Sequence, residues 1–392
     1  MSKLDFTAGS TKIEGKEWQI DRWTRHKTTT SVLFDENQKF HSFGYPAENF
    51  YNDHIGSKDL DMDKWYFFQN IKFEITEKQE HLDDQYMIFD IRNKNRMKTI
   101  DVLTNIIRFL KDDLLKTLNQ RLRNFDNGVV KWILTVPVIW QTNTVGFFKR
   151  AAVQAGIPTD RQTVILEPEA AAFYCEQKDF EILELEDGTK ILSTLPLNTK
   201  YLVVDLGGGT IDITEHMREN RRANSYQQKA LGLKWGGTTV NKCFEEYCSS
   251  EFKSDFEELK ENHPDDYLYL MENFEHEKIQ FTVDKLIKSE YIRVRIPVSL
   301  SNNGKDKLFI PSKTVRSFFN TSIDGLVKKL KQLLLSAENG MQTVKTIFVV
   351  GGFAESSIVV CELKSEFSQF DIVVPKKPEL AVMHGAVLFG FT

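Results

Sequence analysis

The chain has 392 residues, of which 41% are hydrophobic and 27% charged, and its formal net charge is -5 at pH 7. This length can form two or more domain-sized cores, and the acidic charge gives no reason to expect nucleic acid or an anionic membrane as partner. No apolar run approaches the ~20 residues of a membrane helix, and the N-terminal residues lack the apolar core of a signal peptide, so we expect a cytoplasmic protein.

The first half of the chain shows strands followed by long helices. Alternating residues from Trp18 to about Tyr51 predict strands and hairpins. An apolar period near 3.6 predicts a long amphipathic helix at Thr99–Arg123. After it we expect a buried strand at Lys131–Val138, a helix at Asn143–Ala155, a strand at Thr163–Leu166 and a helix from Pro168.

The second half repeats this order of strands and helices. The polar segment Glu176–Asn198 contains glycine and proline and predicts a connector between two lobes. Downstream we expect acidic helices over Lys242–Phe281 that break at Pro264, a strand at Tyr291–Ser299 and an amphipathic helix at Val315–Leu335. The alternation predicts an α/β fold in two successive halves.

A glycine turn between two apolar strands is the main chemical signal. Residues 201–214 read YLVVDLGGGTIDIT, and the β-branched residues after Gly209 predict a second strand, whereas dinucleotide-binding and P-loop glycines open into a helix. Bare backbone at such a turn can direct N–H groups at an anion. Asp205 and Asp212 flank it, and a carboxylate beside a phosphate implies a magnesium ion between them. The alternative is a tight hairpin whose glycines have φ > 0 and whose aspartates face solvent.

Several further motifs follow one another in a recognisable order. They are FHSFGYPAENFY and WYFFQNIKF near the front, then ILTVPVIWQTNTVGFFKRAAVQAGI, ILEPEAAAFYCE, DLGGGTIDIT, TIFVVGGFAESS and PELAVMHGAVLFG. In this order and content the chain resembles the 70-kDa heat-shock protein family of the actin-like ATPase superfamily, and within it the divergent member-12 branch. The similarity covers essentially Trp18 to the C-terminus.

The resemblance implies an actin-like ATPase fold with two lobes, each a mixed sheet flanked by helices, a cleft between them and no peptide-binding β-domain. Lobe I would span residues 1–196, with a small subdomain at about 35–104 and completion by the C-terminal helix 378–392. Lobe II would span residues 197–377, with a small subdomain at about 238–311.

The resemblance also implies ATP or ADP with Mg²⁺ as ligands and assigns site residues. Asp205, Glu167 and Asp212 would be catalytic, and the two aspartates would hold the metal through water. The nucleotide-binding residues would be Gly207, Gly208, Gly209, Thr210, Gly236, Gly237, Glu275, Lys278, Gly351 and Gly352. Taken from the residues alone, Glu275 and Lys278 form an ordinary i,i+3 surface pair, and Glu167 is a carboxylate favoured at a helix N-terminus. His216, His263 and His276 have polar neighbours, which predicts surface histidines.

The sequence also departs from the family pattern. The family's first phosphate loop is a strand followed by Asp-x-Gly-Thr-Thr, which Leu4–Ser10 resembles only faintly. We expect its supporting strand to be missing, through truncation or degeneration. Lys72 is the nearest candidate for the family's phosphate-facing lysine. Three functions remain open: a slow Mg-dependent ATPase that acts as a nucleotide-controlled switch, a catalytically degenerate interaction scaffold, and a small-molecule kinase of the same superfamily.

Overall fold

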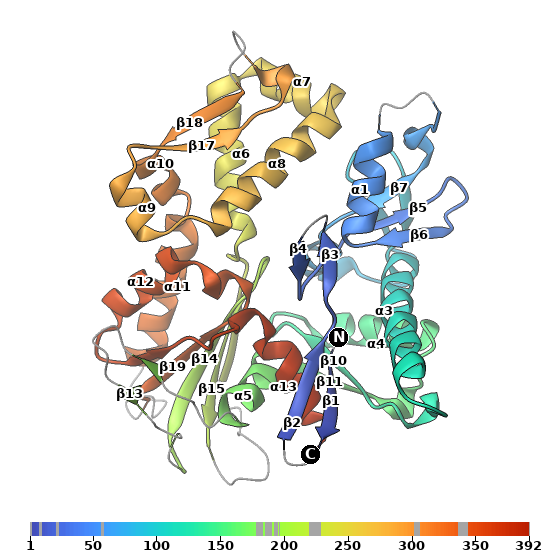
Figure 1. Ribbon diagram of the computed structural model, residues 1–392, viewed down its shortest axis with the longest axis vertical. Coiled ribbons are helices and arrows are strands. Elements are labelled where there is room, and N and C mark those ends of the chain that lie inside the picture. Colours follow the sequence, from blue (N-terminus) through green and yellow to red (C-terminus); the bar gives the residue numbers. More distant parts are fainter. Residues whose placement is uncertain are drawn as a thin grey trace. The chain divides into compact units, whose positions relative to one another are not determined.

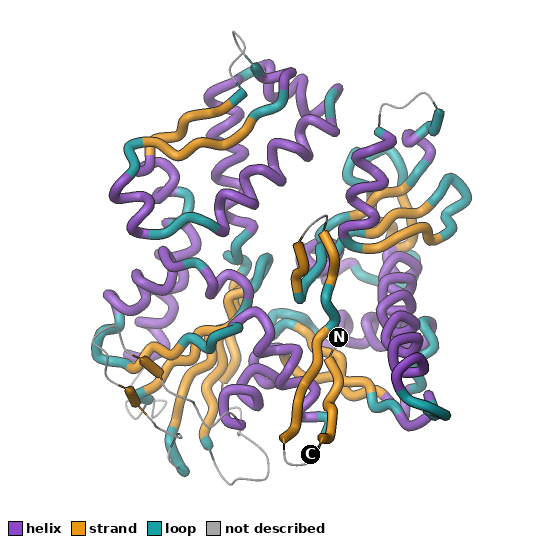
Figure 2. Tube along the Cα trace, viewed as in Figure 1, coloured by secondary structure: helices purple, strands orange, loops and turns teal. Residues whose placement is uncertain are grey.

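The computed structural model describes residues 2–7, 10–20, 23–55, 59–177, 183–184, 190–191, 195, 197–218, 229–301, 306–335 and 344–391. Its contacts divide the chain into two compact units, and each is described by itself (Figure 1). Unit 1 comprises Met1–Ile165 with Ala386–Phe391, and unit 2 comprises Leu166–Gly385. Helices and strands are interspersed in both units (Figure 2), which confirms a mixed α/β architecture.

Unit 1 combines small antiparallel sheets with helices. Its strands are β1 (Ser2–Thr7), β2 (Ser10–Gly15), β3 (Trp18–Ile20), β4 (Trp23–Arg25), β5 (Val32–Phe34), β6 (Phe40–Phe43), β7 (Tyr66–Phe68), β8 (Met87–Phe89), β9 (Arg96–Lys98), β10 (Trp132–Val136) and β11 (Gln162–Leu166), which ends at the boundary. Its helices are α1 (Tyr45–His54), α2 (Ile71–Glu77), α3 (Thr99–Arg121) and α4 (Thr142–Gln154). Phe34, Ile106 and Phe147 from a strand and two helices join one core, so the helices predicted at Thr99 and Asn143 are confirmed.

Two predictions in unit 1 are wrong. Helix α1 begins at Tyr45, where alternation had suggested strands. Gly44 has φ 72°, which ends the preceding strand, and the proline that follows Tyr45 suits the first turn of a helix. At the N-terminus, β1 pairs with β2 and Asp5 lies opposite Lys12, so the supporting strand is present rather than missing. The turn of that hairpin, Ala8 and Gly9, lies outside the described residues.

Unit 2 is organised around a five-stranded mixed sheet in the order β16-β15-β14-β19-β20. Its strands are β12 (Leu183–Glu184), β13 (Lys190–Ile191), β14 (Lys200–Leu206), β15 (Ile211–Met217), β16 (Lys229–Leu233), β17 (Tyr291–Arg295), β18 (Lys307–Pro311), β19 (Thr346–Val350) and β20 (Asp371–Val373). Its helices are α5 (Glu167–Gln177), α6 (Thr238–Phe252), α7 (Ser254–Asn262), α8 (Pro264–Ile279), α9 (Val283–Lys288), α10 (Ser312–Ser317), α11 (Asn320–Leu335), α12 (Ser357–Glu366) and α13 (Ala381–Phe389), which ends in unit 1. β14 is antiparallel to β15 and parallel to β19, and Leu202 and Val204 of β14 belong to the core of this unit.

The start of unit 2 and one of its helices differ from the sequence expectation. Helix α5 packs against β14 and β15, so the contacts begin unit 2 at Leu166, whereas lobe I was expected to reach residue 196; the lobe boundaries themselves stay a prediction. Most of the expected connector Glu176–Asn198 lies outside the described residues. The helix expected at Val315–Leu335 is interrupted between α10 and α11. The interruption buries two neighbouring rings in different places, because Phe318 packs with Phe274 and Phe319 with Phe353.

Candidate functional site

The glycine turn of unit 2 connects two paired strands, as predicted. β14 and β15 are antiparallel, with Asp205 opposite Asp212 and Leu206 opposite Ile211. The N–H of Gly207 donates to the carbonyl of Thr210 across the turn, at 2.9 Å. Both strands are buried along nearly their whole length, which fixes the position of the turn.

The carbonyl groups of the turn all point to the segment that begins α6. The oxygen of Gly207 accepts from the N–H of Gly237 at 3.1 Å, and that of Gly209 from the N–H of Gly236 at 3.4 Å. The oxygen of Gly208 accepts both the N–H and the hydroxyl of Thr238, at 2.8 and 2.9 Å.

These contacts determine where the N–H groups of the turn are directed. In a planar trans peptide the C=O of one residue and the N–H of the next point in opposite directions. The N–H groups of Gly208, Gly209 and Thr210 therefore point away from α6. In the part of the chain that the structure describes, the Gly208 and Gly209 N–H groups donate to no protein acceptor. Successive N–H groups of this kind form an anion-binding nest.

Glycine is required here by the close approach of two backbones. A Cβ on Gly236 would lie 2.3 Å from the oxygen of Gly208, and one on Gly207 would lie 2.8 Å from the oxygen of Thr210. A Cβ on Gly208 would meet no atom within 4 Å. The glycines of the turn do not have positive φ, so the alternative of a hairpin that needs φ > 0 does not describe it.

The two aspartates of the hairpin are buried, which contradicts the alternative of solvent-facing side chains. Asp205 is 5% exposed and Asp212 is 1% exposed, and the hydroxyl of Thr210 donates to Asp212 Oδ2 at 3.2 Å. Residues directly opposite in an antiparallel pair share one face of the sheet, where two like charges destabilise each other. A cation between them would remove this repulsion.

The carboxylate oxygens of this hairpin suit magnesium, which is partly bound by water and phosphate. They do not suit a metal whose ligands are all protein side chains. Among the described residues, no group of three or more His, Cys, Asp or Glu side chains could hold a metal. Mg²⁺ prefers oxygen ligands and is commonly bound by one or two carboxylates together with water and phosphate. Asp205 and Asp212 supply such a pair beside the turn.

Lys278 is not the ordinary surface residue that its spacing from Glu275 suggested. Its side chain is only 10% exposed, and its Nζ donates to the carbonyl of Gly237 at 3.2 Å, to Asn241 Oδ1 at 2.7 Å and to Glu275 Oε2 at 2.6 Å. Burial lowers the pKa of Lys278, and the Glu275 carboxylate opposes this effect. An ammonium group has three donors. Two of them join α8 to α6 and to the segment that holds the glycine turn, and the third is donated to Glu275 within α8.

The other predicted residues are placed around the same sheet. Gly351 has φ 91°, and a Cβ there would lie 2.4 Å from Asp205 Oδ1. Gly352 begins a short 3₁₀ helix (Gly352–Glu355), whose Phe353 ring would lie 3.3 Å from a Cβ on Gly237. Glu167 is the first residue of α5, which packs against β14 and β15. The structure thus brings the predicted glycines, Asp205, Asp212, Thr210, Glu275 and Lys278 together within unit 2, whereas Lys72 belongs to α2 in unit 1.

Sequence reasoning missed Thr238 and Asn241 and placed one histidine wrongly. Thr238 and Asn241 are three residues apart in the first turn of α6, directly after the Gly236–Gly237 pair, and this spacing could have identified them. His216 is fully buried rather than on the surface; its Nε2 lies 2.7 Å from the Thr214 hydroxyl and its ring stacks on Tyr201. His263 and His276 are exposed, as predicted.

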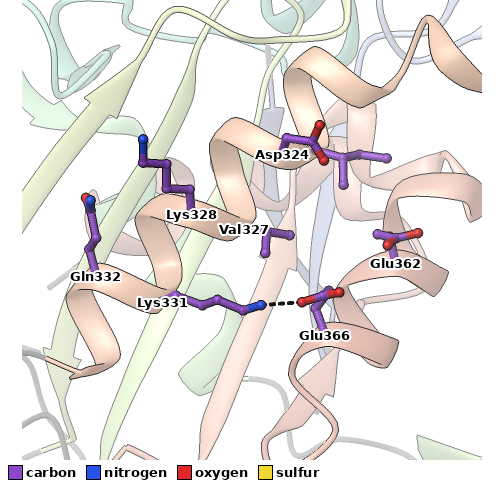
Figure 3. A pocket seen from close by; sticks show the side chains of 8 residues that line it. Asp324, Val327, Lys328, Lys331, Gln332, Glu362 and Glu366 are labelled. Carbon is purple, nitrogen blue, oxygen red and sulfur yellow. Dashed lines mark hydrogen bonds and ion pairs between the residues drawn. The ribbon is translucent and has the colours of Figure 1, made fainter.

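A separate groove lies between α11 and α12 (Figure 3). Val327 lines its apolar part, and Lys331 pairs with Glu366 across it. It contains none of the predicted site residues. Within the described residues, no helix has the length and apolar character of a membrane span.

Comparison with known proteins agrees with the motif order. The family model described as Hsp70 protein matches residues 52–390. Heat shock 70 kDa protein 12A of Homo sapiens is 27% identical over 94% of this chain and 63% of its own length, and the Mus musculus protein of that name gives the same shares. Heat shock 70 kDa protein 12B of Homo sapiens is 26% identical over 93% of this chain and 62% of its own length. The chain therefore spans less than two thirds of the curated relatives that it matches.

The family model covers most of the chain, and the glycine hairpin, the Gly236–Gly237 segment and the Gly351–Gly352 strand end lie inside the matched range. The described residues contain no separate peptide-binding β-domain. The chain belongs to the Hsp70 protein family, whose ATPase domain has the actin-like fold.

Proposed function

We propose that unit 2 binds ATP or ADP with Mg²⁺ at the glycine hairpin. The observation that carries this proposal is the direction of the turn: its carbonyls are held by the α6 segment, and its N–H groups from Gly208 to Thr210 point away from that segment. These three N–H donors suit the β- and γ-phosphates, and each charge-assisted bond contributes about 1.5–3 kcal/mol.

The remaining site residues take roles around this phosphate site. Asp205 and Asp212 would hold magnesium through water, and an ion held there would supply charge that offsets the phosphates. Glu167 orients a water from the start of α5. Gly351 and Gly352 let the nucleoside approach the end of β19. Glu275 and Lys278 support the ribose side, where Lys278 acts by holding the carbonyl of Gly237.

The nucleotide would act as a switch that is reset by slow hydrolysis to ADP, with the two lobes as the moving parts. The alternative is an interaction scaffold that binds nucleotide without turnover. The sequence supports this alternative, because the 392 residues contain no complete Asp-x-Gly-Thr-Thr motif. A small-molecule kinase is the third candidate function. The cytoplasm stays the proposed compartment.

Nucleotide binding is tested by thermal unfolding with and without millimolar Mg-ATP. A ligand that binds only the folded state raises the melting temperature by mass action. We expect this rise in the natural protein and its loss in Gly208→Val, since the open space at Gly208 accepts the side chain without disturbing the fold but the nest is then blocked. Gly146→Ala in α4 is the matched glycine control and keeps the rise. An unchanged melting curve of the natural protein would remove nucleotide from the function.

Turnover separates the three functions. Purified protein is incubated with γ-labelled ATP, and Asp205→Asn serves as the control. A hydrolase releases inorganic phosphate that the variant does not release, a scaffold releases none, and a kinase transfers the label to a small acceptor. Label on an acceptor would contradict both the ATPase and the scaffold.

A further inference from the structure

Strands β17 and β18 of unit 2 form a hairpin (Figure 1). Its outward face is basic and aromatic, although the chain as a whole is acidic. Both strands alternate between exposed and buried side chains, and the inward residues belong to the core. The exposed residues form three cross-strand pairs: Tyr291 with Pro311, Arg293 with Phe309, and Arg295 with Lys307. We call these six residues the basic face.

The cations of the basic face are not neutralised by neighbours in the described structure. Arg293, Arg295 and Lys307 have no Asp or Glu oxygen within 4 Å among the described residues. Arg295 and Lys307 are directly opposite each other, a pairing of like charges that destabilises a sheet. The exposed acids Glu290 and Asp306 directly precede Tyr291 and Lys307 in the chain, so Asp306 adjoins the Arg295–Lys307 end of the hairpin and no acid adjoins Arg293.

The aromatic residues add an apolar contact at the same place. Phe309 is 49% exposed and Tyr291 is 47% exposed, and the guanidinium of Arg293 lies 5.6 Å from the centre of the Phe309 ring. Exposed aromatic and arginine side chains are typical of protein interfaces.

We propose that the basic face binds an extended acidic segment of a partner protein. In an extended chain the side chains on one face are two residues apart, as Tyr291, Arg293 and Arg295 are. Alternate carboxylates can therefore meet both guanidinium groups, and the next side chain on the same face of the segment can contact Tyr291, beside the Phe309 ring. Among the described residues β17 and β18 pair only with each other, so each has an edge without a neighbouring strand.

The charge of the whole chain favours a short acidic segment over a larger polyanion. A membrane or a duplex extends beyond the basic face and would meet a chain whose net charge is -5. The attraction of the three cations falls off within a Debye length of about 8–10 Å at physiological salt. This proposal does not involve the glycine hairpin, so it stands independently of nucleotide binding.

The test is fluorescence anisotropy with a labelled peptide of alternating Glu and Val, titrated with the full chain at low and at physiological salt. We expect saturable binding that weakens with salt, and a peptide of alternating Lys and Val that does not bind. The triple variant Arg293→Ser, Arg295→Ser and Lys307→Ser weakens binding at least tenfold. The matched control removes three exposed cations elsewhere, as Lys116→Ser, Lys149→Ser and Lys364→Ser, and changes binding less than twofold.

Phe309→Ser provides a second readout that does not alter charge. It weakens the acidic peptide at least threefold and leaves the salt dependence unchanged. Equal losses in the two triple variants would overturn the proposal, because they would indicate attraction by net charge alone. Failure of the acidic peptide to bind, or preferential binding to phosphatidylserine vesicles or to a single-stranded oligonucleotide, would overturn it as well. Melting temperatures of all variants confirm that they are folded.

Discussion

Gly208 and Gly351 are two glycines of the candidate site that should tolerate a side chain very differently. At Gly351 the backbone has φ 91° and a Cβ would overlap both Asp205 Oδ1 and the oxygen of Leu206, at 2.4 Å each. Gly351→Ala should therefore lower the free energy of unfolding by about 1–3 kcal/mol. Gly208→Ala enters open space and should change it by less than about 0.5 kcal/mol. Urea unfolding of both variants checks this, and equal midpoints would contradict the packing described for Gly351.

His216 should make the stability of unit 2 sensitive to acid. Burial lowers the pKa of His216 to about 3, whereas the value in an unfolded chain is near 6.5. Between these values the unfolded chain binds a proton that the folded chain does not, so stability falls as the pH falls. From pH 7 to pH 5 this amounts to about 2 kcal/mol.

The measurement is the urea midpoint of the natural protein and of His216→Gln at pH 7 and pH 5. The variant has a lower midpoint at pH 7 but should lose about 2 kcal/mol less on acidification, because its side chain does not titrate. A parallel pH dependence in both proteins would show that carboxylates, and not this histidine, control the acid response.

His216 also shows that the burial of a side chain in a sheet cannot be predicted from its sequence neighbours alone. Glu215 and Arg218 are charged neighbours of His216 in sequence, but its actual surroundings come from Tyr201 of the adjacent strand and from Thr214 two residues earlier. Cross-strand register therefore decides the environment. The placement of Asp205 opposite Asp212 was predictable because the strand pair, the glycines and the acids occur within one continuous segment.

At the scale of elements, α8 is connected to the glycine turn through Lys278. Lys278 holds the carbonyl of Gly237, whose N–H in turn binds the carbonyl of Gly207. Lys278→Met removes this link, and we expect the dissociation constant of Mg-ATP to rise about tenfold, in line with one lost hydrogen bond to a charged group. Isothermal titration with the nucleotide measures it.

Lys285→Met is the matched control for this change. Lys285 also pairs with a glutamate of α8, at 3.3 Å from Glu277, but its side chain is 36% exposed and has no contact with the turn. Its removal should leave nucleotide affinity unchanged within twofold. If both variants bind Mg-ATP like the natural protein, Lys278 is structural only. If the natural protein itself does not bind Mg-ATP, the proposed function is contradicted.

Element types were predictable where an apolar period was long, and element ends were not. Helix α3 follows a long apolar stripe, from Ile100 to Leu118, and was found where expected. The period that predicted one helix at Val315–Leu335 continues through Phe318 and Phe319, and only the positions of Phe274 and Phe353 explain why the backbone breaks there. Lys278 is a similar case. The i,i+3 spacing of Glu275 and Lys278 is the same whether the pair lies on an exposed or on a buried face of the helix, so the sequence does not show that Lys278 is buried.

At the scale of the whole molecule, the order of motifs predicted the family. The order did not predict with which compact unit α5 packs, and the contacts of α5 show this. Helix α5 follows a strand of unit 1 in the sequence but packs on the central sheet of unit 2. This places Glu167 and the glycine hairpin in the same compact unit. The local sequence pattern of α5 does not show that its packing partners are β14 and β15, because these strands come later in the chain.

Coupling between the two units is the property that separates a switch from a scaffold, and hydrogen exchange of the full chain can measure it. Mg-ATP should slow exchange of the Gly208, Gly209 and Thr210 amides, since these groups donate to no described protein acceptor and would donate to phosphate. In a switch, a ligand acts by binding one arrangement of the lobes better than another, so protection should also spread into unit 1, including α2 with Lys72. Mg-ADP should reproduce the protection of the turn but less of that in unit 1. Protection confined to unit 2 with both nucleotides would contradict the switch and leave a binding scaffold, and a turn that exchanges equally fast with and without nucleotide would contradict both.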